Sequence, residues 1–379
     1  MTGHRSQTAD YLLVAAGLAV AFALVEAGLR IHNPFGFRMR GNRIVLPANK
    51  TYRIQDSRLD KVEKLDKVII HTKNSLGFRG PEPPPDFARR LTIVAIGGST
   101  TECFFLSDDK TWPARLEAKL KPVFPSVWVN NAGLDGHSTF GHLVLMSNYI
   151  SKLRPKLVLL LAGANDIFTD APKQFDQTRN SRVVGSLADH SEAVALAVNL
   201  VRHARTRRFE ALGAMPRPLA LRFQQTRMMS PEQERALVEG EGRRLRGYQE
   251  RLEELAEVAR SAGIELVLLT QPALVGDAVD DATGADLAAV GLEMYQPMNG
   301  HVAWRLLELY NDVTRSVGRR RGLTVVDLAR EMPKSSRYYY DFFHFTNEGA
   351  DKVGDIIFAS LCPALRDKQP VLAAAPCPR

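Results

Sequence analysis

The chain has 379 residues, of which 24% are charged and 45% are apolar, proportions typical of a globular protein. This length can bury a full hydrophobic core in one large domain with additions or in two domains. The formal net charge of +8 is compatible with anionic partners such as acidic polysaccharide or lipid headgroups. Because arginine and lysine are spread over many segments and no nucleic-acid-binding motif occurs, we expect no nucleic acid as a partner.

The three cysteines are too few for a disulfide-based scaffold. Cys362 and Cys377 could pair across a short C-terminal loop in an oxidising compartment. Cys103 is expected to be a small apolar packing residue. Neither CxxC nor HExxH spacing occurs, which argues against a structural zinc site and against a zincin-type protease. The sequence therefore predicts neither a metal nor a cofactor.

An apolar segment lies near the N-terminus. Residues Tyr11 to Val25 carry no charge, and extending the segment to Leu29 gives nineteen residues that include only Glu26 as a charge. A membrane-spanning helix needs about twenty apolar residues. The alternatives are a buried core helix and a signal peptide cleaved near Glu26. We expect an uncleaved membrane anchor within residues 1–32, with secretion after cleavage as the alternative.

The charges that flank this segment bear on its orientation. More basic residues follow it than precede it: Arg30, Arg38, Arg40 and Arg43 against His4 and Arg5. Taken literally, the positive-inside rule would leave the body of the chain inside the cell. We nevertheless expect an extracytoplasmic body, periplasmic or on the cell surface, because of the family resemblance described below.

The remainder of the chain alternates strands with helices. Residues 33–90 are expected to form an extended, irregular connector that ends in a proline-rich stretch. Apolar runs predict buried strands at 91–98, 127–130, 157–163, 264–272 and 323–329. Helical patterns occupy 111–120, about 140–153, about 193–207, 231–262, about 301–318 and about 347–361.

Alternation of this kind predicts an α/β fold with about five parallel strands and helices on both faces of the sheet. The expected catalytic domain covers residues 91–365 and contains a mainly helical insertion at about 170–300. We expect the insertion to lie over the active-site face and to shape the acceptor cleft. Residues 366–379 are expected to form a C-terminal tail.

Four short polar runs stand where these elements meet. GGST (97–100), NAG (131–133) and GAND (163–166) follow the first three strands, and DFFH (341–344) precedes the last helix. Ligands of an open parallel sheet bind outside the carboxyl ends of its strands. We therefore expect the four runs to meet in one crevice.

The residue types in these runs suit acyl transfer. Ser99 could act as a nucleophile if His344 removes its proton, and Asp341 could orient the imidazole. Attack on an ester carbonyl places negative charge on oxygen, which needs preorganised donors. The backbone N–H groups of Ser99 and Gly133 and the side-chain amide of Asn165 are the expected oxyanion hole.

These blocks resemble the SGNH (GDSL-type) hydrolase superfamily, whose name refers to Ser, Gly, Asn and His in four blocks, here Ser99, Gly133, Asn165 and His344. The resemblance implies a flavodoxin-like three-layer α/β/α fold and a Ser-His-Asp esterase or acyl-transfer mechanism. It covers about 91–166 and 323–361, but little of 167–320.

The first block departs from G-D-S-L, because Gly98 stands where Asp is usual. GGST is similar to the first block of bacterial envelope members of the superfamily. Those members also tend to have an N-terminal membrane segment and an N-x-x-G-F-R-G run like residues 74–80. The resemblance thus points to a membrane-anchored envelope protein.

Several of these residues have structural alternatives. Ser99 could cap a helix, and Asn165 and Asp166 could be turn residues. His137 and His142 invite a metal interpretation, but no third ligand stands at a useful spacing.

Two further features stay open. Arg79 could bind an anionic group or pin the connector. The aromatic residues among 338–343 could stack on sugar rings or pack beneath the catalytic loop.

The sequence thus predicts a membrane-anchored serine esterase that acts on O-acyl esters, with O-acetyl esters of an extracytoplasmic carbohydrate or envelope substrate favoured. A lipid esterase or thioesterase and an O-acetyltransferase are the enzymatic alternatives. A carbohydrate-binding or assembly subunit that retains the fold is the non-enzymatic one. The sequence determines neither the acyl acceptor or donor, nor protein partners, nor the oligomeric state.

Overall fold

The structure is a computed structural model that describes residues 7–32, 39–41, 43–57, 59, 62, 64–172, 182–205, 221, 227–293 and 297–378. The chain forms two compact units. The larger comprises Leu46–Asp176 and Leu212–Arg379, and the smaller comprises Met1–Val45 and Gln177–Ala211. This division differs from the predicted one, because part of the expected insertion belongs to the same unit as the N-terminal helix.

A five-stranded parallel sheet forms the centre of the larger unit. Its strands are β5 (Leu91–Gly97), β6 (Val127–Asn131), β7 (Leu157–Leu161), β8 (Glu265–Leu269) and β11 (Thr324–Val326). They lie in the order β11-β8-β7-β5-β6, with every neighbouring pair parallel. Within this sheet, the first strand in chain order, β5, lies between the second, β6, and the third, β7, which is the flavodoxin-like order. The predicted fold class and all five strands are confirmed.

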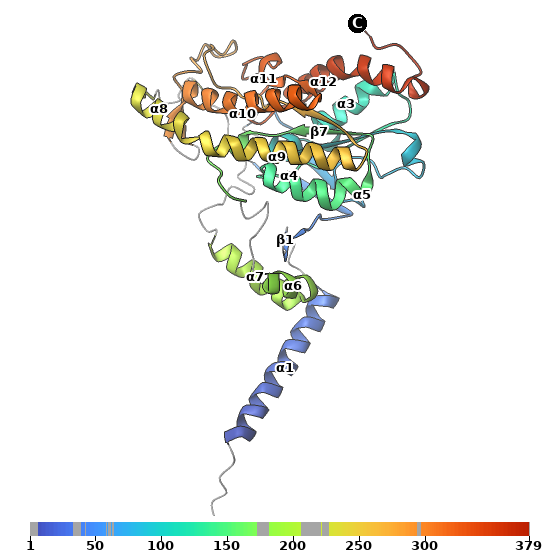
Figure 1. Cartoon of the computed structure of the whole chain (residues 1–379), viewed down its shortest axis with the longest axis vertical. Helices are drawn as coiled ribbons and strands as arrows, with labels where there is room; N and C mark the ends of the chain where they lie inside the picture. Colours follow the sequence, from blue (N-terminus) through green and yellow to red (C-terminus); the bar gives the residue numbers. More distant parts are fainter. Residues whose placement is uncertain are drawn as a thin grey trace, which may run out of the picture. The chain divides into compact units, whose positions relative to one another are not determined.

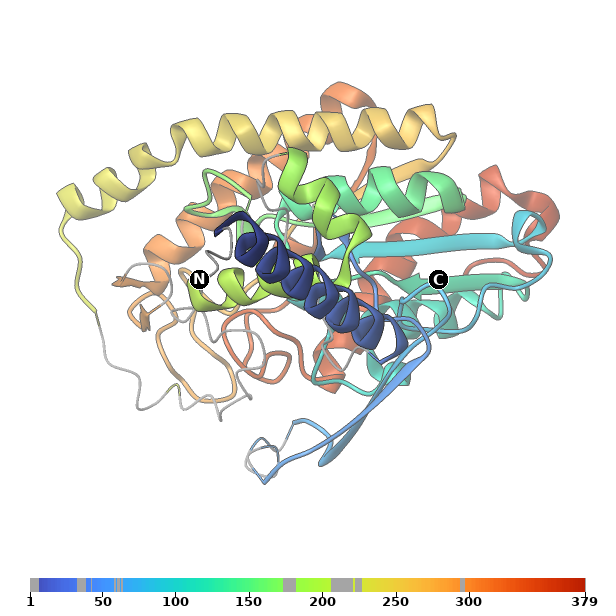
Figure 2. The same ribbon diagram turned by 90° about the horizontal axis from the view of Figure 1, so that it is seen from below.

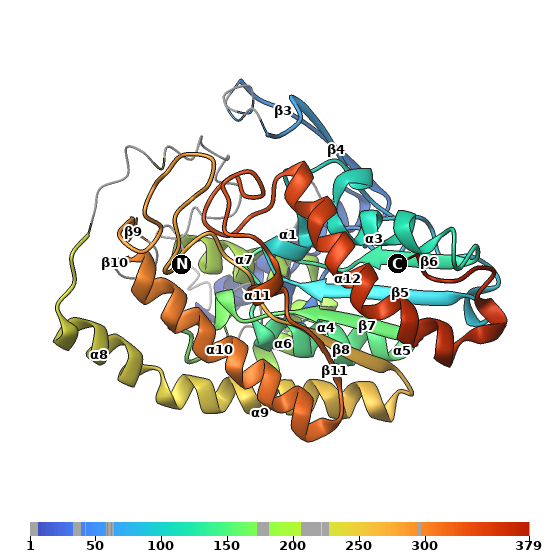
Figure 3. The ribbon, with the colours of Figure 1, turned by 90° about the horizontal axis from the view of Figure 1, so that it is seen from above.

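Helices cover both faces of this sheet, as right-handed crossovers require. On one face, α3 (Trp112–Leu120) packs against α12 (Asn347–Lys368) (Figures 1 and 3). On the other face lie α4 (Thr139–Leu145), α9 (Gly242–Ser261) and α10 (Gly300–Arg321). Other elements of this unit are α2 (Ser99–Glu102), α5 (Ser151–Leu153), α8 (Pro231–Gly240), α11 (Leu328–Glu331), β9 (Gly291–Glu293) and β10 (Pro297–Asn299).

The predicted helix over 231–262 is in fact two helices, α8 and α9, separated at Glu241. Glycines at 240 and 242 weaken the helix on either side of that residue. The Glu241 side chain is buried there and accepts hydrogen bonds from Tyr310 and Arg244. Likewise, β8 lies within the expected insertion at 170–300 but is an inner strand of the sheet, so the insertion is shorter than predicted.

The segment predicted as an irregular connector contains a regular strand pair. β3 (Lys50–Gln55) and β4 (Val68–Lys73) pair antiparallel, with Lys50 opposite Lys73 and Gln55 opposite Val68. The prediction was wrong for this stretch because the prolines that suggested irregular structure, at 34, 47 and 81–85, all lie outside the strand pair. Further along, Arg79 makes an antiparallel bridge with Asn131 at the end of β6.

The C-terminal segment is attached to the larger unit. Helix α12 continues to Lys368, into the expected tail, and Cys362 forms a disulfide with Cys377. The Ala374 N–H also donates a hydrogen bond to the Val123 carbonyl. The pairing considered from the sequence is therefore present in the structure.

The smaller unit contains α1 (Gln7–Ile31), β1 (Met39–Arg40), β2 (Arg43–Ile44), α6 (Arg182–His190) and α7 (Glu192–Arg205). Within α1, the span Ala9–Ile31 contains an 18-residue window with a mean hydropathy of 2.3, and no residue of that window is buried. The helix is long and apolar enough to cross a membrane, and a signal sequence would meet the same criteria.

Candidate active site

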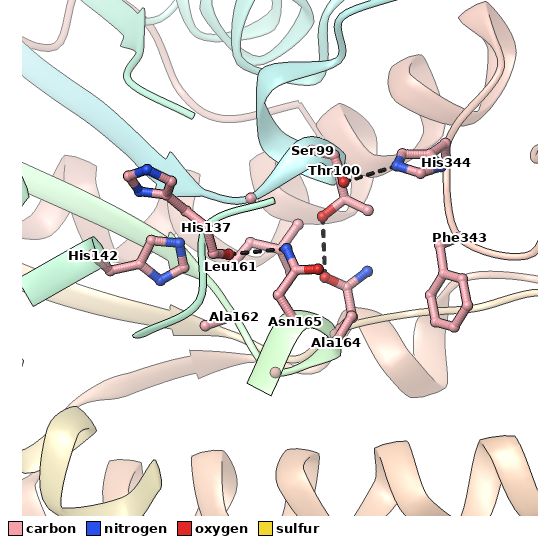
Figure 4. A pocket seen from close by; sticks show the side chains of 13 residues that line it. Ser99, Thr100, His137, His142, Leu161, Ala162, Ala164, Asn165, Phe343 and His344 are labelled. Carbon is pink, nitrogen blue, oxygen red and sulfur yellow. Dashed lines mark hydrogen bonds between the residues drawn. The ribbon is translucent and has the colours of Figure 1, made fainter. Parts of the chain in front are cut away.

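Three predicted residues from distant parts of the chain meet at the carboxyl edge of the sheet. Ser99 is the first residue of α2, directly after β5. Its Oγ lies 2.8 Å from Nε2 of His344 (Figure 4). On the other side of the imidazole, Nδ1 of His344 lies 2.6 Å from Oδ2 of Asp341. The arrangement is a continuous hydroxyl–imidazole–carboxylate chain.

The Asp341 carboxylate is fixed by its own turn. Its Oδ1 atom accepts hydrogen bonds from the backbone N–H groups of Phe343 at 2.8 Å and His344 at 2.7 Å. Aspartate often closes a turn in this way. The other oxygen, Oδ2, therefore remains directed at the imidazole.

The electrostatics of the pair stabilise its charged forms. Burial disfavours the imidazolium, but the charge and hydrogen bond of Asp341 outweigh it and raise the pKa of His344. Burial would likewise raise the pKa of Asp341, but His344 and the two backbone N–H donors lower it below its usual value. The ring of Tyr340 stacks on the imidazole at 5.5 Å with an interplanar angle of 9° and restricts its rotation.

The turn that carries Ser99 contains a glycine at its start. A Cβ at Gly98 would lie 2.5 Å from Nδ2 of Asn165, so the absence of a side chain lets that amide approach the turn. The Ser99 N–H makes no hydrogen bond to any residue that the structure describes, as expected at the start of a helix.

Asn165 belongs to the same site. It lies in a 3-10 turn, Ala164–Asp166, and its Nδ2 donates a hydrogen bond to the His137 carbonyl at 2.9 Å (Figure 4). The next residue, Asp166, accepts hydrogen bonds from the backbone N–H of Thr139 and from Arg251. These contacts join the third block to the loop of the second block, so Asp166 is more than a local turn residue.

Gly133 does not reach the site in the predicted way. Its N–H donates a hydrogen bond to Oδ1 of Asn131 at 2.9 Å, and a Cβ would lie 2.3 Å from the backbone nitrogen of Glu102. Its lack of a side chain therefore serves packing against α2, and its N–H is already engaged. Gly136, three residues later, has a φ of 74° and precedes His137, which lines the cavity. Its N–H has no partner within the described part of the chain.

Ser99, Asn165 and His344 open into a cavity of about 120 Å³. Its other lining residues are Gly98, Thr100, His137, His142, Leu161, Ala162, Gly163, Ala164, Gln271 and Phe343. The sequence did not single out Gln271, whose Oε1 accepts a hydrogen bond from the Thr100 hydroxyl at 3.1 Å. Its place after the fourth strand, at the carboxyl edge, is the signal that could have identified it.

The two histidines considered as metal ligands both line this cavity, with ring centroids 6.4 Å apart. Burial lowers the pKa of His142 to about 3, so its ring is neutral at physiological pH. Among the described residues, no group of three or more His, Cys, Asp or Glu side chains is placed to hold a metal ion.

Arg79 has a structural role. Its buried guanidinium donates hydrogen bonds to the carbonyls of Glu102, Cys103 and Leu106 and pairs with Asp108. The run at 74–80 therefore fixes the end of α2 and the loop that follows it. The Glu102 carboxylate adds to this support, because it accepts a hydrogen bond from Lys73 at 3.1 Å and one from the Asp135 N–H at 2.5 Å.

Two of the five aromatic residues in this cluster are packed into the core of the molecule. Tyr339 and Tyr340 are buried, and Tyr339 packs against Phe345 at 5.6 Å between ring centroids. Phe343 is the member of the cluster that lines the cavity. Packing beneath the catalytic loop therefore describes these tyrosines better than stacking on a sugar ring.

A model of the GDSL-like lipase/acylhydrolase family matches residues 95–352. The chain belongs to this family. The predicted membership of the SGNH (GDSL-type) hydrolases is thereby confirmed, and with it a class of enzymes that act on ester bonds. The match spans all four blocks.

Individual relatives are distant. The esterase TesA of Pseudomonas aeruginosa is 25% identical over 114 residues, which are 30% of this chain and 57% of that esterase. The chain thus aligns with little more than half the length of this relative. Among solved structures, the acetylxylan esterase Axe2 of Geobacillus stearothermophilus has a TM-score of 0.42 at 12% identity and covers 71% of this chain and 93% of its own. LAE5, a hydrolase from the Lake Arreo metagenome, has a TM-score of 0.41 at 17% identity and covers 71% and 94%.

Proposed function

We propose that this protein is a serine esterase that cleaves short acyl esters, O-acetyl esters above all, of an extracytoplasmic carbohydrate or envelope substrate. The observation that carries the proposal is the chain of contacts from Ser99 through His344 to Asp341 at the mouth of a small cavity. Structural alternatives for each of the three residues alone do not account for these two contacts together.

In the proposed reaction, the Ser99 oxygen attacks the ester carbonyl while Nε2 of His344 takes the hydroxyl proton. The Asp341 carboxylate keeps Nδ1 protonated and stabilises the imidazolium that forms. The imidazolium then donates its proton to the leaving alcohol. Water, activated by the same imidazole, hydrolyses the acyl-enzyme and restores Ser99.

The negative charge of the tetrahedral intermediate needs donors near Ser99. The Ser99 N–H and the Asn165 amide are two of the three predicted donors. For the third we substitute the N–H of Gly136 for that of Gly133, because Gly133 already bonds to Asn131 and Gly136 precedes a cavity residue.

The size of the cavity supports a short acyl group. At about 120 Å³ it is well below the roughly 300–1,000 Å³ of pockets that enclose drug-sized ligands. A lipid esterase or long-chain thioesterase would need an apolar groove for the acyl chain. Acetyl transfer to a second hydroxyl would use the same acyl-enzyme, and only the acceptor would differ.

Two features support an extracytoplasmic location. The apolar helix α1 would tether the protein to a membrane, and the disulfide between Cys362 and Cys377 is of a kind that persists in oxidising compartments. A tethered enzyme acts on material held close to the membrane, which favours an envelope substrate. A binding or assembly subunit remains the non-enzymatic alternative, but such a role does not need Ser99, His344 and Asp341 in contact.

The proposal is tested by hydrolysis of p-nitrophenyl esters from acetyl to dodecanoyl. We expect the highest kcat/KM for acetyl, a steep fall with chain length, and no hydrolysis by the Ser99→Ala variant. Ser151→Ala, on α5 away from the cavity, is the matched control and should retain full activity. A preference for long chains would favour the lipid esterase, and activity in Ser99→Ala would refute the proposed nucleophile.

The location is tested separately by proteolysis of intact spheroplasts that express the full chain. Cleavage of the larger unit without lysis is the expected result. If the larger unit resisted the protease until the membrane was permeabilised, it would lie inside the cell, as the positive-inside rule predicts from the flanking charges.

A further inference from the structure

The smaller unit has an apolar surface besides that of α1. On α6, Val183, Val184 and Leu187 are 68%, 38% and 54% exposed. On α7, Leu200 and Val201 are 55% and 51% exposed. Val183, Val184 and Leu187 share one side of α6, because residues three or four positions apart lie on the same face, and Leu200 and Val201 are neighbours on the surface of α7. We call these five residues the α6–α7 apolar face.

The corner between α6 and α7 is tied to the end of α1. The Glu26 carboxylate accepts hydrogen bonds from the Ser191 hydroxyl at 2.8 Å and from the N–H groups of Glu192 at 3.1 Å and Ala193 at 3.0 Å. These are the unsatisfied donors at the start of α7, where a carboxylate is also favoured by the helix dipole. Arg30 bonds to Glu26 at 2.8 Å and to the His190 carbonyl at 2.7 Å.

These contacts fix the level of the corner along α1. The apolar span has 23 residues, which at about 1.5 Å per residue is about 34 Å, slightly more than the roughly 30 Å hydrocarbon core of a bilayer. In a membrane-spanning α1, Glu26 and Arg30 near its C-terminal end would therefore lie where hydrocarbon gives way to headgroups. Figure 1 shows α6 and α7 beside this end of α1, and in the view from below in Figure 2 they lie behind α1.

We propose that α6 and α7 lie in the membrane interface, with the α6–α7 apolar face in contact with lipid. This inference rests on the proposed membrane anchoring by α1. Lipid is the occupant because the face belongs to the same unit as α1, in which no residue of Ala9–Ile31 is buried, and is attached at the level where that helix leaves the hydrocarbon. Amphipathic helices bind in this way with their apolar side in the headgroup–acyl boundary.

The same contacts bear on the N-terminal segment. A signal peptidase cut near Glu26 would remove the carboxylate that caps α7 and would detach the corner. The smaller unit keeps these contacts between α1 and α7 only if α1 is not cleaved off. The α6–α7 segment is thus a second membrane contact rather than a wall of the acceptor cleft.

The test uses the full chain in vesicles of phosphatidylethanolamine and phosphatidylglycerol, with single cysteines that carry an environment-sensitive fluorophore. The sites are Leu187→Cys and Leu200→Cys on the proposed face, Leu18→Cys within α1, and Glu239→Cys on exposed α8 as the control. Cys103 is buried and the other two cysteines are paired, so the background of labelling is low. Nitroxide lipids quench either near the headgroups or near the bilayer centre.

We expect Leu18→Cys to be quenched by deep nitroxides, Leu187→Cys and Leu200→Cys by shallow nitroxides, and Glu239→Cys by neither. Quenching at Leu18→Cys without quenching at the other two would overturn the interfacial placement and leave the anchor intact; a protein partner would then be the better occupant. No quenching at Leu18→Cys would instead remove the proposed anchor itself. Retained esterase activity and circular dichroism show that each labelled variant is folded.

Discussion

The Asp341 carboxylate uses one oxygen to hold its own turn and the other, Oδ2, to accept a hydrogen bond from Nδ1 of His344 at 2.6 Å. The contact with Oδ2 favours the imidazole tautomer with the proton on Nδ1, which leaves Nε2 available to accept the Ser99 proton. It also makes the charge and hydrogen bond of Asp341 the main influences that raise the pKa of His344, with a further contribution from the charge of Asp135.

The pH dependence of hydrolysis follows from this pair. Only neutral imidazole can take the Ser99 proton, and Asp341 raises the pKa of His344 above its ordinary value of 6.5. We therefore expect kcat/KM to fall as the pH drops through an apparent pKa above 6.5. In Asp341→Asn the acid limb should move to lower pH and kcat should fall by about 10⁴-fold, as in other triads. An acid limb that stays in place would show that Asp341 does not set the pKa of the base.

Removing the Asn165 amide should weaken transition-state stabilisation. Loss of one oxyanion donor typically lowers kcat by about 10²–10³-fold. For Asn165→Ala we expect a loss of that order in kcat with little change in KM on p-nitrophenyl acetate. A loss confined to KM would assign the amide to substrate binding instead. Asn165 also donates a hydrogen bond to the His137 carbonyl, so the substitution could destabilise the fold. An unchanged midpoint of urea unfolding would show that the loss of activity does not come from unfolding.

The buried pair of Lys73 and Glu102 predicts a stability effect rather than a direct catalytic one. Lys73→Met would leave a buried carboxylate without its cation, which typically costs about 3–5 kcal/mol of unfolding free energy. Lys73→Met combined with Glu102→Gln removes both charges and should recover part of that loss. Urea denaturation measures both values. Equal destabilisation of the single and double variants would show that the charges do not interact.

The disulfide between Cys362 and Cys377 should stabilise the end of α12. The two residues are 15 positions apart, and closing a loop of that size contributes about 3 kcal/mol in the chain-entropy description. Reduction or Cys377→Ser should therefore lower the melting temperature measurably. Alkylation before and after reduction, followed by intact-mass measurement, checks that the pair is oxidised. Two accessible thiols in the unreduced protein would contradict the pairing.

The central sheet could be predicted because its strands are continuous apolar runs, such as 91–98 and 157–163, which suit burial on both faces. The positions of Ser99, Asn165 and His344 followed from the same pattern, since all three lie at strand ends or before the last helix. For these strands, the local apolar pattern and the position in the folded sheet agree, and the strands could therefore be predicted.

Prediction failed at positions whose role depends on contacts with residues that are distant in sequence. Nothing local distinguishes Gly133, whose N–H bonds to Asn131, from Gly136, which lies beside a cavity residue. The break at Glu241 depends on Tyr310 from a different helix. In the sequence, Glu26 is only a single charge in an apolar segment. Its hydrogen-bond partners, Ser191, Glu192 and Ala193, are about 165 residues away and could not be identified from the sequence.

The most direct test of the account is covalent labelling of the nucleophile with a fluorophosphonate probe. Such a probe reacts with a serine oxygen only when a base activates it. We expect the wild-type protein to gain one phosphonyl group on the peptide that contains Ser99, with labelling abolished in Ser99→Ala and greatly slowed in His344→Ala. Absence of labelling in a folded wild-type protein, or equal labelling of Ser99→Ala, would contradict the claim that Ser99 and His344 form an esterase site.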